Sequence, residues 1–363
     1  MRLHDRVSTR AADERMASNG LASACVAVRA LGAALRRLHG GTLRRLHWQD
    51  VHGGHVVRSE LRNVGISVAS SPSRPSREAP ADELSAPRPG GGWNGLAGRG
   101  GLREPRRNMA GYSSILVEHR GAIARITLNR PEKRNPIGPA TCGELVRALA
   151  ELKGAAETRV IVLTGAGVAF SAGGDLSAMS GAPDAQAASL VELLLAMHDV
   201  GKPLIAMVNG PAFAGGLGIM VACDVAIAAD TATFSLPEIA VGLWPMMITA
   251  EITRNVGRKK TLELMLTGRR IDAAEALSCG LVTRVVPAAE LEAATDQLAG
   301  ELAERSPAAV ALGLRAFYAS QDLALEPQLR YLEAEFVKVL ALDDAREGIT
   351  AFLTKRKPVW TGK

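Results

Sequence analysis

The chain has 363 residues, of which 47% are hydrophobic and 22% charged, and its formal net charge is +6. This composition excludes a wholly disordered chain and is typical of a globular protein with a sizeable core. A positive net charge by itself suggests an anionic partner such as nucleic acid. The charge is unevenly placed, however: residues 1–108 hold 18 Arg and 9 acidic residues, a net charge of +9. Residues 109–363 therefore carry −3, and the basic average does not describe them.

Residues 1–108 lack the pattern of a packed domain. Residues 70–77 and 87–92 are rich in Ser, Pro, Arg and Gly, and such stretches cannot bury enough apolar surface to offset chain entropy. We expect residues 1–108 to form a disordered Arg-rich extension. One explanation is translated sequence upstream of a true start at Met109; a targeting segment or a functional basic tail is the alternative.

Residues 109–363 begin with a β-hairpin pattern. Two alternating apolar segments, 115–119 and 122–128, flank Arg120-Gly121. Two continuous apolar runs, 160–164 and 204–208, predict buried strands, and the apolar periodicity between these strands is helical. Strand, helix and strand in this rhythm predict an α/β core with parallel pairing. The two helices are marked by Leu145, Leu149 and Leu152, and by Leu190, Leu194 and Met197.

From about residue 306 the pattern becomes helical. Ser306-Pro307 is typical of an N-cap followed by the first helical position, and Asp343-Asp344 suggests the cap of a last helix. An apolar stripe runs between them, which predicts an oligomerisation surface.

Several familiar chemistries are absent from the sequence. It contains no G-x-S-x-G, no Walker A and no HExxH motif, and only His119 and His198 occur after Met109. The segment 165–170 begins like a dinucleotide fingerprint but has Phe170 in place of the third glycine, which favours a simple tight turn. Four scattered cysteines indicate a reducing compartment, and we expect a cytoplasmic protein unless residues 1–108 target it to an organelle.

After these exclusions, two glycine-rich turns and one acidic residue remain as candidate functional features. The turns are 170–176 and 209–218, and each lies between a predicted buried strand and a helical pattern. Glycines there let a ligand approach the backbone, and N–H groups near a helix N-terminus bind anions. Two such turns can supply two donors to one developing oxyanion.

These segments resemble the enoyl-CoA hydratase/isomerase (crotonase) superfamily. The resemblance implies a crotonase (ClpP/crotonase-like) α/β spiral of β-β-α units over 109–305 and a helical C-terminal trimerisation region over 306–363. It also implies an acyl-CoA substrate, with coenzyme A as part of that substrate and no separate cofactor or metal. The segments that carry it are 128–131, 170–176, 210–216, 223–224, 234–242, 266–268 and 273–282.

The resemblance also implies roles for individual residues. Glu238 matches a family general acid/base, and the backbone N–H groups of Ala172 and Gly215 match an oxyanion hole. Lys355–Lys357 resembles a tail that approaches CoA phosphates, with a solvated surface as the alternative. The implied substrate-binding residues are Lys133, Arg134, Asn135, Ala172, Gly173, Gly174, Asp175 and Gly215.

The sequence departs from the family's hydratases at one position. Their second glutamate falls at Gly218, which cannot transfer a proton. A lone carboxylate at Glu238 can still move a proton between carbons, which is double-bond isomerisation, or activate water, as in single-glutamate hydratase-lyases. Isomerisation and hydration both remain open. Trp244, Met246 and Met247 either line an apolar acyl pocket or belong to the core.

The expected partners follow from this interpretation. We expect a homotrimer or a dimer of trimers that acts in fatty acid metabolism and binds neither nucleic acid nor membrane. The alternative from another class is a non-catalytic or RNA-associated trimer with a vestigial Glu238. An extension without Lys and rich in Gly and Pro supports RNA binding poorly.

Overall fold

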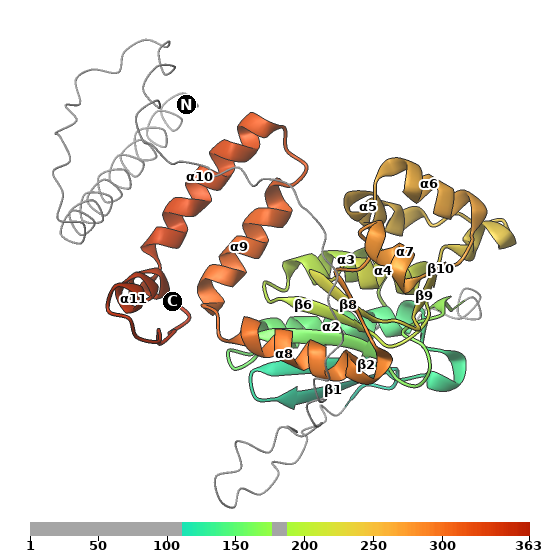
Figure 1. The fold of residues 1–363 in the computed structure, drawn as a ribbon, viewed down its shortest axis with the longest axis horizontal. Helices are drawn as coiled ribbons and strands as arrows, with labels where there is room; N and C mark the ends of the chain where they lie inside the picture. Colours follow the sequence, from blue (N-terminus) through green and yellow to red (C-terminus); the bar gives the residue numbers. More distant parts are fainter. Residues whose placement is uncertain (1–110, 176–186) are drawn as a thin grey trace, which may run out of the picture. The chain divides into compact units, whose positions relative to one another are not determined.

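A computed structural model describes residues 111–175 and 187–363. The predictions for residues 1–108 lie outside this range. The chain folds around a six-stranded sheet in the order β1-β2-β4-β6-β8-β11, in which β1 and β2 are antiparallel and the other neighbours are parallel (Figure 1). The strands are β1 (Ile115–Arg120), β2 (Ile123–Leu128), β4 (Val160–Gly165), β6 (Leu204–Val208), β8 (Val225–Ala229) and β11 (Arg284–Val286).

The predicted hairpin and buried strands are confirmed. β1 pairs with β2 from Ile115↔Leu128 to Arg120↔Ile123, and Gly121 takes a φ of 60° in the turn between them. All six residues of β4 and all five of β6 are buried. Such continuous burial occurs where helices cover both faces of a parallel sheet.

The two faces of the sheet pack against different helices. α2 (Pro139–Gly154) and α3 (Leu190–Asp199) cover one face, where Ile161 and Leu163 of β4 point. α8 (Leu291–Ala303) covers the other face, where Val160 and Val162 point. This alternation follows from the two-residue period of a strand.

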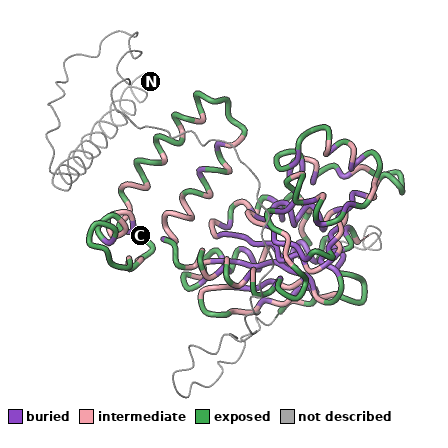
Figure 2. Tube along the Cα trace, in the orientation of Figure 1, coloured by how far each residue is buried: buried purple, intermediate pink, exposed green. Residues whose placement is uncertain are grey.

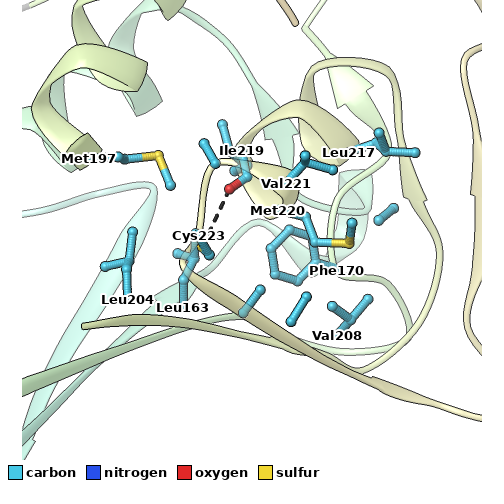
Figure 3. Close-up of a cluster of buried hydrophobic side chains, with 14 of the residues drawn as sticks. Leu163, Phe170, Met197, Leu204, Val208, Leu217, Ile219, Met220, Val221 and Cys223 are labelled. Atoms are coloured by element: carbon cyan, nitrogen blue, oxygen red, sulfur yellow. Dashed lines mark hydrogen bonds between the residues drawn. The ribbon is translucent and has the colours of Figure 1, made fainter. Parts of the chain in front are cut away.

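α4 (Ala214–Val221) is the central helix of the core. Its side chains are apolar all round, as expected for a helix buried on every side. Figure 3 shows Leu217, Ile219 and Met220 of this helix among Phe170, Leu204 and other buried side chains. The helix is therefore held in place by packing, and this fixes the backbone at its N-terminus.

Short strands form two smaller sheets beside the six-stranded one. β7 (Ala212–Phe213), β9 (Thr233–Ser235) and β10 (Ile271–Asp272) form a sheet in the order β10-β9-β7, while β3 (Pro136–Ile137) pairs with β5 (Gly173–Gly174). The remaining helical elements of this part are η1 (Pro131–Lys133), η3 (Pro237–Val241), α5 (Met246–Asn255), α6 (Arg258–Thr267), α7 (Ala273–Ser278) and η4 (Ala288–Glu290).

The C-terminal region is helical, as predicted. It comprises α9 (Pro307–Ser320), α10 (Leu325–Ala341) and α11 (Asp343–Leu353), and the Ser306 side chain caps α9 by accepting a hydrogen bond from the Ala309 amide at 3.1 Å. Figure 2 shows α10 without a buried residue. Within the described ranges, no helix is long and apolar enough to cross a membrane.

α9 is anchored on the core through Tyr318. Its ring stacks on His198 of α3 at 4.2 Å between centroids, and its hydroxyl donates to Asp224 at 2.5 Å. His198 therefore has a structural role in the contact between α3 and α9.

One predicted cap differs. Leu342, not an aspartate, is the N-cap residue of α11. Asp344 is buried and instead accepts hydrogen bonds from the Ser306 hydroxyl at 2.7 Å and the Thr361 amide at 2.7 Å. Its carboxylate ties the end of the chain to the start of α9, a contact between segments that local pattern does not reveal.

Candidate active site

Three extended segments run side by side and parallel at the edge of the core. Ala212 pairs with Phe234 in the β7–β9 ladder, and Ser171 forms a parallel bridge with Ala212. Because the three segments are parallel, their carboxyl ends lie at the same side, and the residues that follow each segment come together there. Gly174, Gly215 and Glu238 all follow there, within four residues of the paired positions, so this end of the segments is the candidate site.

Glu238 lies on the 3-10 helix η3, which begins directly after β9 with Pro237 at its first position. The helix closes at Gly242, whose φ of 76° is strained for other residues, and the Leu243 amide donates to the Glu238 carbonyl at 3.0 Å. Oε2 of Glu238 is buried and has no hydrogen-bond partner among the described residues. Burial raises the pKa of this carboxyl above its ordinary value of 4.5. An unpartnered carboxylate with a raised pKa is typical of a group that transfers protons.

Two backbone amides lie close to each other at this end of the segments. Gly215 lies in the first turn of α4, where amides have no partner within the helix, and the N-cap Phe213 supplies no side-chain acceptor. A β-carbon placed on Gly215 would lie 4.0 Å from the amide nitrogen of Gly174. The Asp175 amide donates to the Ile137 carbonyl at 3.0 Å, and successive amides of a strand point to opposite sides. The Gly174 N–H therefore points away from β3.

The prediction of Ala172 as an oxyanion donor requires a correction. The Ala172 amide donates to the Arg134 carbonyl at 2.8 Å, so its hydrogen is used inside the fold. The geometry favours Gly174 as the partner of Gly215. The sequence motif alone could not distinguish the two, because the direction of each amide depends on the pairing with residues 134–137.

Unusual backbone conformations gather around these turns. Gly173 has a φ of 99°, and Ala214, Arg134 and Asn135 have positive φ angles of 48°, 58° and 57°. A β-carbon on Gly173 would lie 2.6 Å from the Ala214 β-carbon. Such strain persists only where the surrounding structure holds it, and it is common at functional sites.

The loop that carries Lys133, Arg134 and Asn135 divides into two parts. Lys133 and Arg134 are exposed, and their role in substrate binding stays a prediction. Asn135 is only 1% exposed, which excludes it from direct substrate contact and corrects that prediction. Its Nδ2 donates to the carbonyls of Ala166 and Ala169, both at 2.9 Å, and its Oδ1 accepts from the Arg130 amide at 2.9 Å. Asn135 is thus a structural link between three loops.

Asn135→Ala is expected to destabilise the fold by about 2–5 kcal/mol, because several buried backbone groups lose their partner at once. The shift in the urea concentration at the midpoint of unfolding, with an unchanged dependence of the unfolding free energy on urea, measures this loss. Lys133→Ala is the control, and as an exposed substitution it should change stability by less than about 0.5 kcal/mol. Equal stability of the two variants would contradict the structural role of Asn135.

Other predicted site residues are bound within the protein. Asp175 pairs with Arg130 at 2.9 Å, so it braces the loop of Lys133 and Arg134. Arg356, in the basic tail, pairs with Glu347 at 2.5 Å. These charges are therefore partly neutralised by the fold.

Gly218 leaves no room for the second acid of the hydratases. A β-carbon there would lie 2.1 Å from Cγ2 of Ile248, a distance that no real side chain tolerates. Ile248 is 2% exposed and fills this side of α4. The sequence reveals the glycine, but only the structure reveals that an apolar side chain from α5 occupies the space in front of it.

Met246 and Met247 are not core residues. They are 69% and 48% exposed, and Leu243 and Val241 beside them are exposed as well. Trp244, by contrast, is partly buried and packs against the core. An apolar surface therefore follows Glu238 along the chain, which suits contact with a hydrocarbon chain. In the part of the chain that the structure describes, His, Cys, Asp and Glu side chains form no group that could hold a metal ion.

The fold and these turns define a protein of the crotonase type, and comparisons with known proteins agree. Residues 118–363 match the family model described as Enoyl-CoA hydratase/isomerase. The chain is similar to the mitochondrial enoyl-CoA hydratase domain-containing protein 3 of Danio rerio, with 36% identity over 72% of this chain and 93% of the relative.

Solved structures give the same result. The chain resembles the enoyl-CoA hydratase of Mycobacterium smegmatis with 31% identity and a TM-score of 0.65, covering 68% of this chain and 99% of that one. It resembles the enoyl-CoA hydratase of Bacillus anthracis with 32% identity and a TM-score of 0.65, covering 69% and 100%. The chain belongs to the enoyl-CoA hydratase/isomerase family, and the predicted crotonase fold is confirmed.

Proposed function

We propose that this protein acts on an acyl-CoA thioester, with Glu238 as its general acid and base and the amides of Gly174 and Gly215 as donors to the thioester oxygen. The observation that carries the proposal is the convergence of Gly174, Gly215 and Glu238 at the ends of three parallel segments. Two amides aimed at a developing oxyanion stabilise the enolate more than the ground-state carbonyl, which lowers the barrier to proton transfer at C2.

The geometry favours isomerisation of a 3-enoyl to a 2-enoyl thioester. The Glu238 carboxylate removes a proton from C2, and the electrons of that bond form a dienolate with its charge on the thioester oxygen. The same carboxyl group then returns the proton to C4, which leaves the double bond between C2 and C3. This route needs one acid, in agreement with Ile248 filling the space in front of Gly218.

Hydration of a 2-enoyl thioester is the second candidate, because the relatives in the comparisons are named as enoyl-CoA hydratases. Glu238 would then take a proton from water as the water oxygen attacks C3, and the same carboxyl group would give that proton to C2. The burial of Oε2 supports either role, since both need a carboxylate whose pKa lies above its ordinary value.

The test is to incubate the full chain separately with a 2-enoyl-CoA and a 3-enoyl-CoA and to identify the products by mass and retention time. An unchanged mass with a shifted double bond from 3-enoyl-CoA supports isomerisation. The gain of one water by 2-enoyl-CoA supports hydration. No change with either substrate would contradict the proposal and favour a binding role.

The activity should depend on pH through Glu238. As a base, this carboxyl must be ionised, and burial raises its pKa above 4.5, so activity should fall as the pH decreases through a value higher than 4.5. The pH profile of kcat/KM reports this ionisation in the free enzyme. A profile that stays flat down to pH 4.5 would contradict Glu238 as the base.

We also propose that the C-terminal helices associate with further copies of the chain, as in the expected homotrimer. Leu325, Leu329 and Phe336 of α10 are 72%, 58% and 59% exposed, and Phe352 of α11 is 82% exposed. An exposed apolar surface of this kind is typical of an interaction site. Sedimentation equilibrium should therefore give a mass larger than that of one chain, and a monomer at micromolar concentration would contradict it.

A further inference from the structure

A second hollow lies away from the Glu238 site. Its volume is about 210 Å³, many times what a single water molecule needs. The residues that precede β4 and β6 line it, together with the end of α2 and the first half of α9. It is therefore at the amino ends of these parallel strands, whereas Gly174, Gly215 and Glu238 follow the carboxyl ends of theirs. We call it the basic hollow, after its lining residues Lys153, Arg159, Lys202 and Arg315.

The basic hollow carries an excess of positive charge. Four cationic side chains line it, while Asp199 is the single acidic residue among its lining. Lys153 and Asp199 form an ion pair at 2.5 Å at its exposed edge. Among the described residues, Arg159, Lys202 and Arg315 have no carboxylate within ion-pair distance. The hollow thus retains three cations without an ion-pair partner, with Glu157 acting on Lys202 from a longer distance.

Backbone carbonyls hold these three side chains in place. Lys202 Nζ donates to the carbonyls of Leu152 and Ala155 at the end of α2. Arg159 donates to the Ala303 carbonyl at 3.1 Å, and Arg315 donates to the Ala311 carbonyl at 3.2 Å. Carbonyl oxygens orient the cations without neutralising them. Burial lowers the pKa of Lys202, and nearby Glu157 opposes this effect only in part.

A buried hydroxyl at the same hollow also lacks a partner. Thr158 lines the hollow and is 2% exposed, and its Oγ1 makes no hydrogen bond to any described residue. A buried hydroxyl without a partner costs about 1–3 kcal/mol of desolvation. The Oγ1 atom itself is closed off from the hollow, so Thr158 forms part of the wall and the three cations are the groups that can meet a ligand.

We propose that the basic hollow binds a phosphate group, either inorganic phosphate or a small phosphomonoester. A phosphate carries up to two negative charges and several acceptor oxygens, which match two guanidinium groups and an ammonium. A single carboxylate would leave more of the positive charge uncompensated. The site is distinct from the acyl-CoA site and does not depend on the chemistry proposed for Glu238.

Equilibrium dialysis of the full chain against radiolabelled phosphate, at constant ionic strength, tests the proposal. One phosphate should bind per chain, and Arg159→Gln and Arg315→Gln should each weaken binding about tenfold or more. Arg284→Gln removes the same charge from an exposed position in β11 and should leave binding unchanged. Competition by glycerol 3-phosphate would indicate that a phosphomonoester also fits; its failure would assign the site to inorganic phosphate.

Thr158→Val is a control for the wall of the hollow. Without phosphate, the variant should unfold at a higher temperature than the wild type, because it removes the unpartnered hydroxyl while keeping the shape of the side chain. Its phosphate affinity should stay unchanged, because Oγ1 does not reach the hollow. Absence of phosphate binding by the wild type, or equal binding by wild type and both Arg variants, would overturn the proposal.

Discussion

Glu238→Gln is expected to lower kcat on the favoured enoyl-CoA by about 10²–10⁴-fold, the usual contribution of a general acid–base group. The substitution keeps the size of the side chain but removes its ability to accept a proton. Since Oε2 has no hydrogen-bond partner among the described residues, the change breaks no bond at that oxygen, and the fold should remain. KM should change little, because the thioester oxygen still meets both amides.

The measurement is steady-state kinetics on purified protein, with circular dichroism as a check of folding. Glu290→Gln, at an exposed position before α8, is the matched control and should retain full activity. Full activity of Glu238→Gln would remove this residue from the mechanism. A large rise in KM with kcat unchanged would assign it to binding instead.

Gly215→Ala should abolish most of the activity while leaving the fold intact. A β-carbon at this position meets only ordinary contacts, at 3.9 Å from a methyl group of Leu190 and 4.0 Å from the Gly174 nitrogen. It therefore fits the protein without ligand, but it enters the space between the two amides where the thioester oxygen would lie. We expect a loss of about 10²–10³-fold in kcat/KM, as on the removal of one oxyanion donor.

The neighbouring Gly216→Ala is the comparison that distinguishes a loss of activity from a loss of stability. Its β-carbon would lie 2.4 Å from the β-carbon of Ser171, so the helix and the turn would have to move apart. This overpacking should cost about 1–3 kcal/mol of stability. Urea unfolding and kinetics on both variants measure the two effects. Equal instability of the two variants, or full activity of Gly215→Ala, would contradict the proposed donor.

An added methyl group is thus expected to lower activity at position 215 and stability at position 216. The reason is that Gly216 faces protein, against Ser171, whereas Gly215 faces the space in front of Gly174. The positive φ of Ala214 and Gly173 on either side of that space indicates that packing of α4 against the turn holds the backbone there. Rigid placement of this kind lets the amides act without reorganisation during the reaction.

Local pattern determined most of the fold and part of the site. The apolar runs at β4 and β6, the hairpin around Gly121 and the cap at Ser306 follow from periods of two and 3.6 residues and from local hydrogen bonding. The order of motifs determined the family and the importance of Glu238. These features are encoded within a few residues of one another, so the sequence suffices to find them.

Tertiary structure alone decided which groups are free to act. Pairing with residues 134–137 occupies the amide of Ala172 and leaves that of Gly174 directed elsewhere, and three loops bury Asn135. Ile248 fills the space in front of Gly218 from a helix 30 residues further along the chain. Arg159, Lys202 and Arg315 meet at one hollow although more than 150 residues separate the first from the last. Such contacts depend on strand order and helix packing, which no local period encodes.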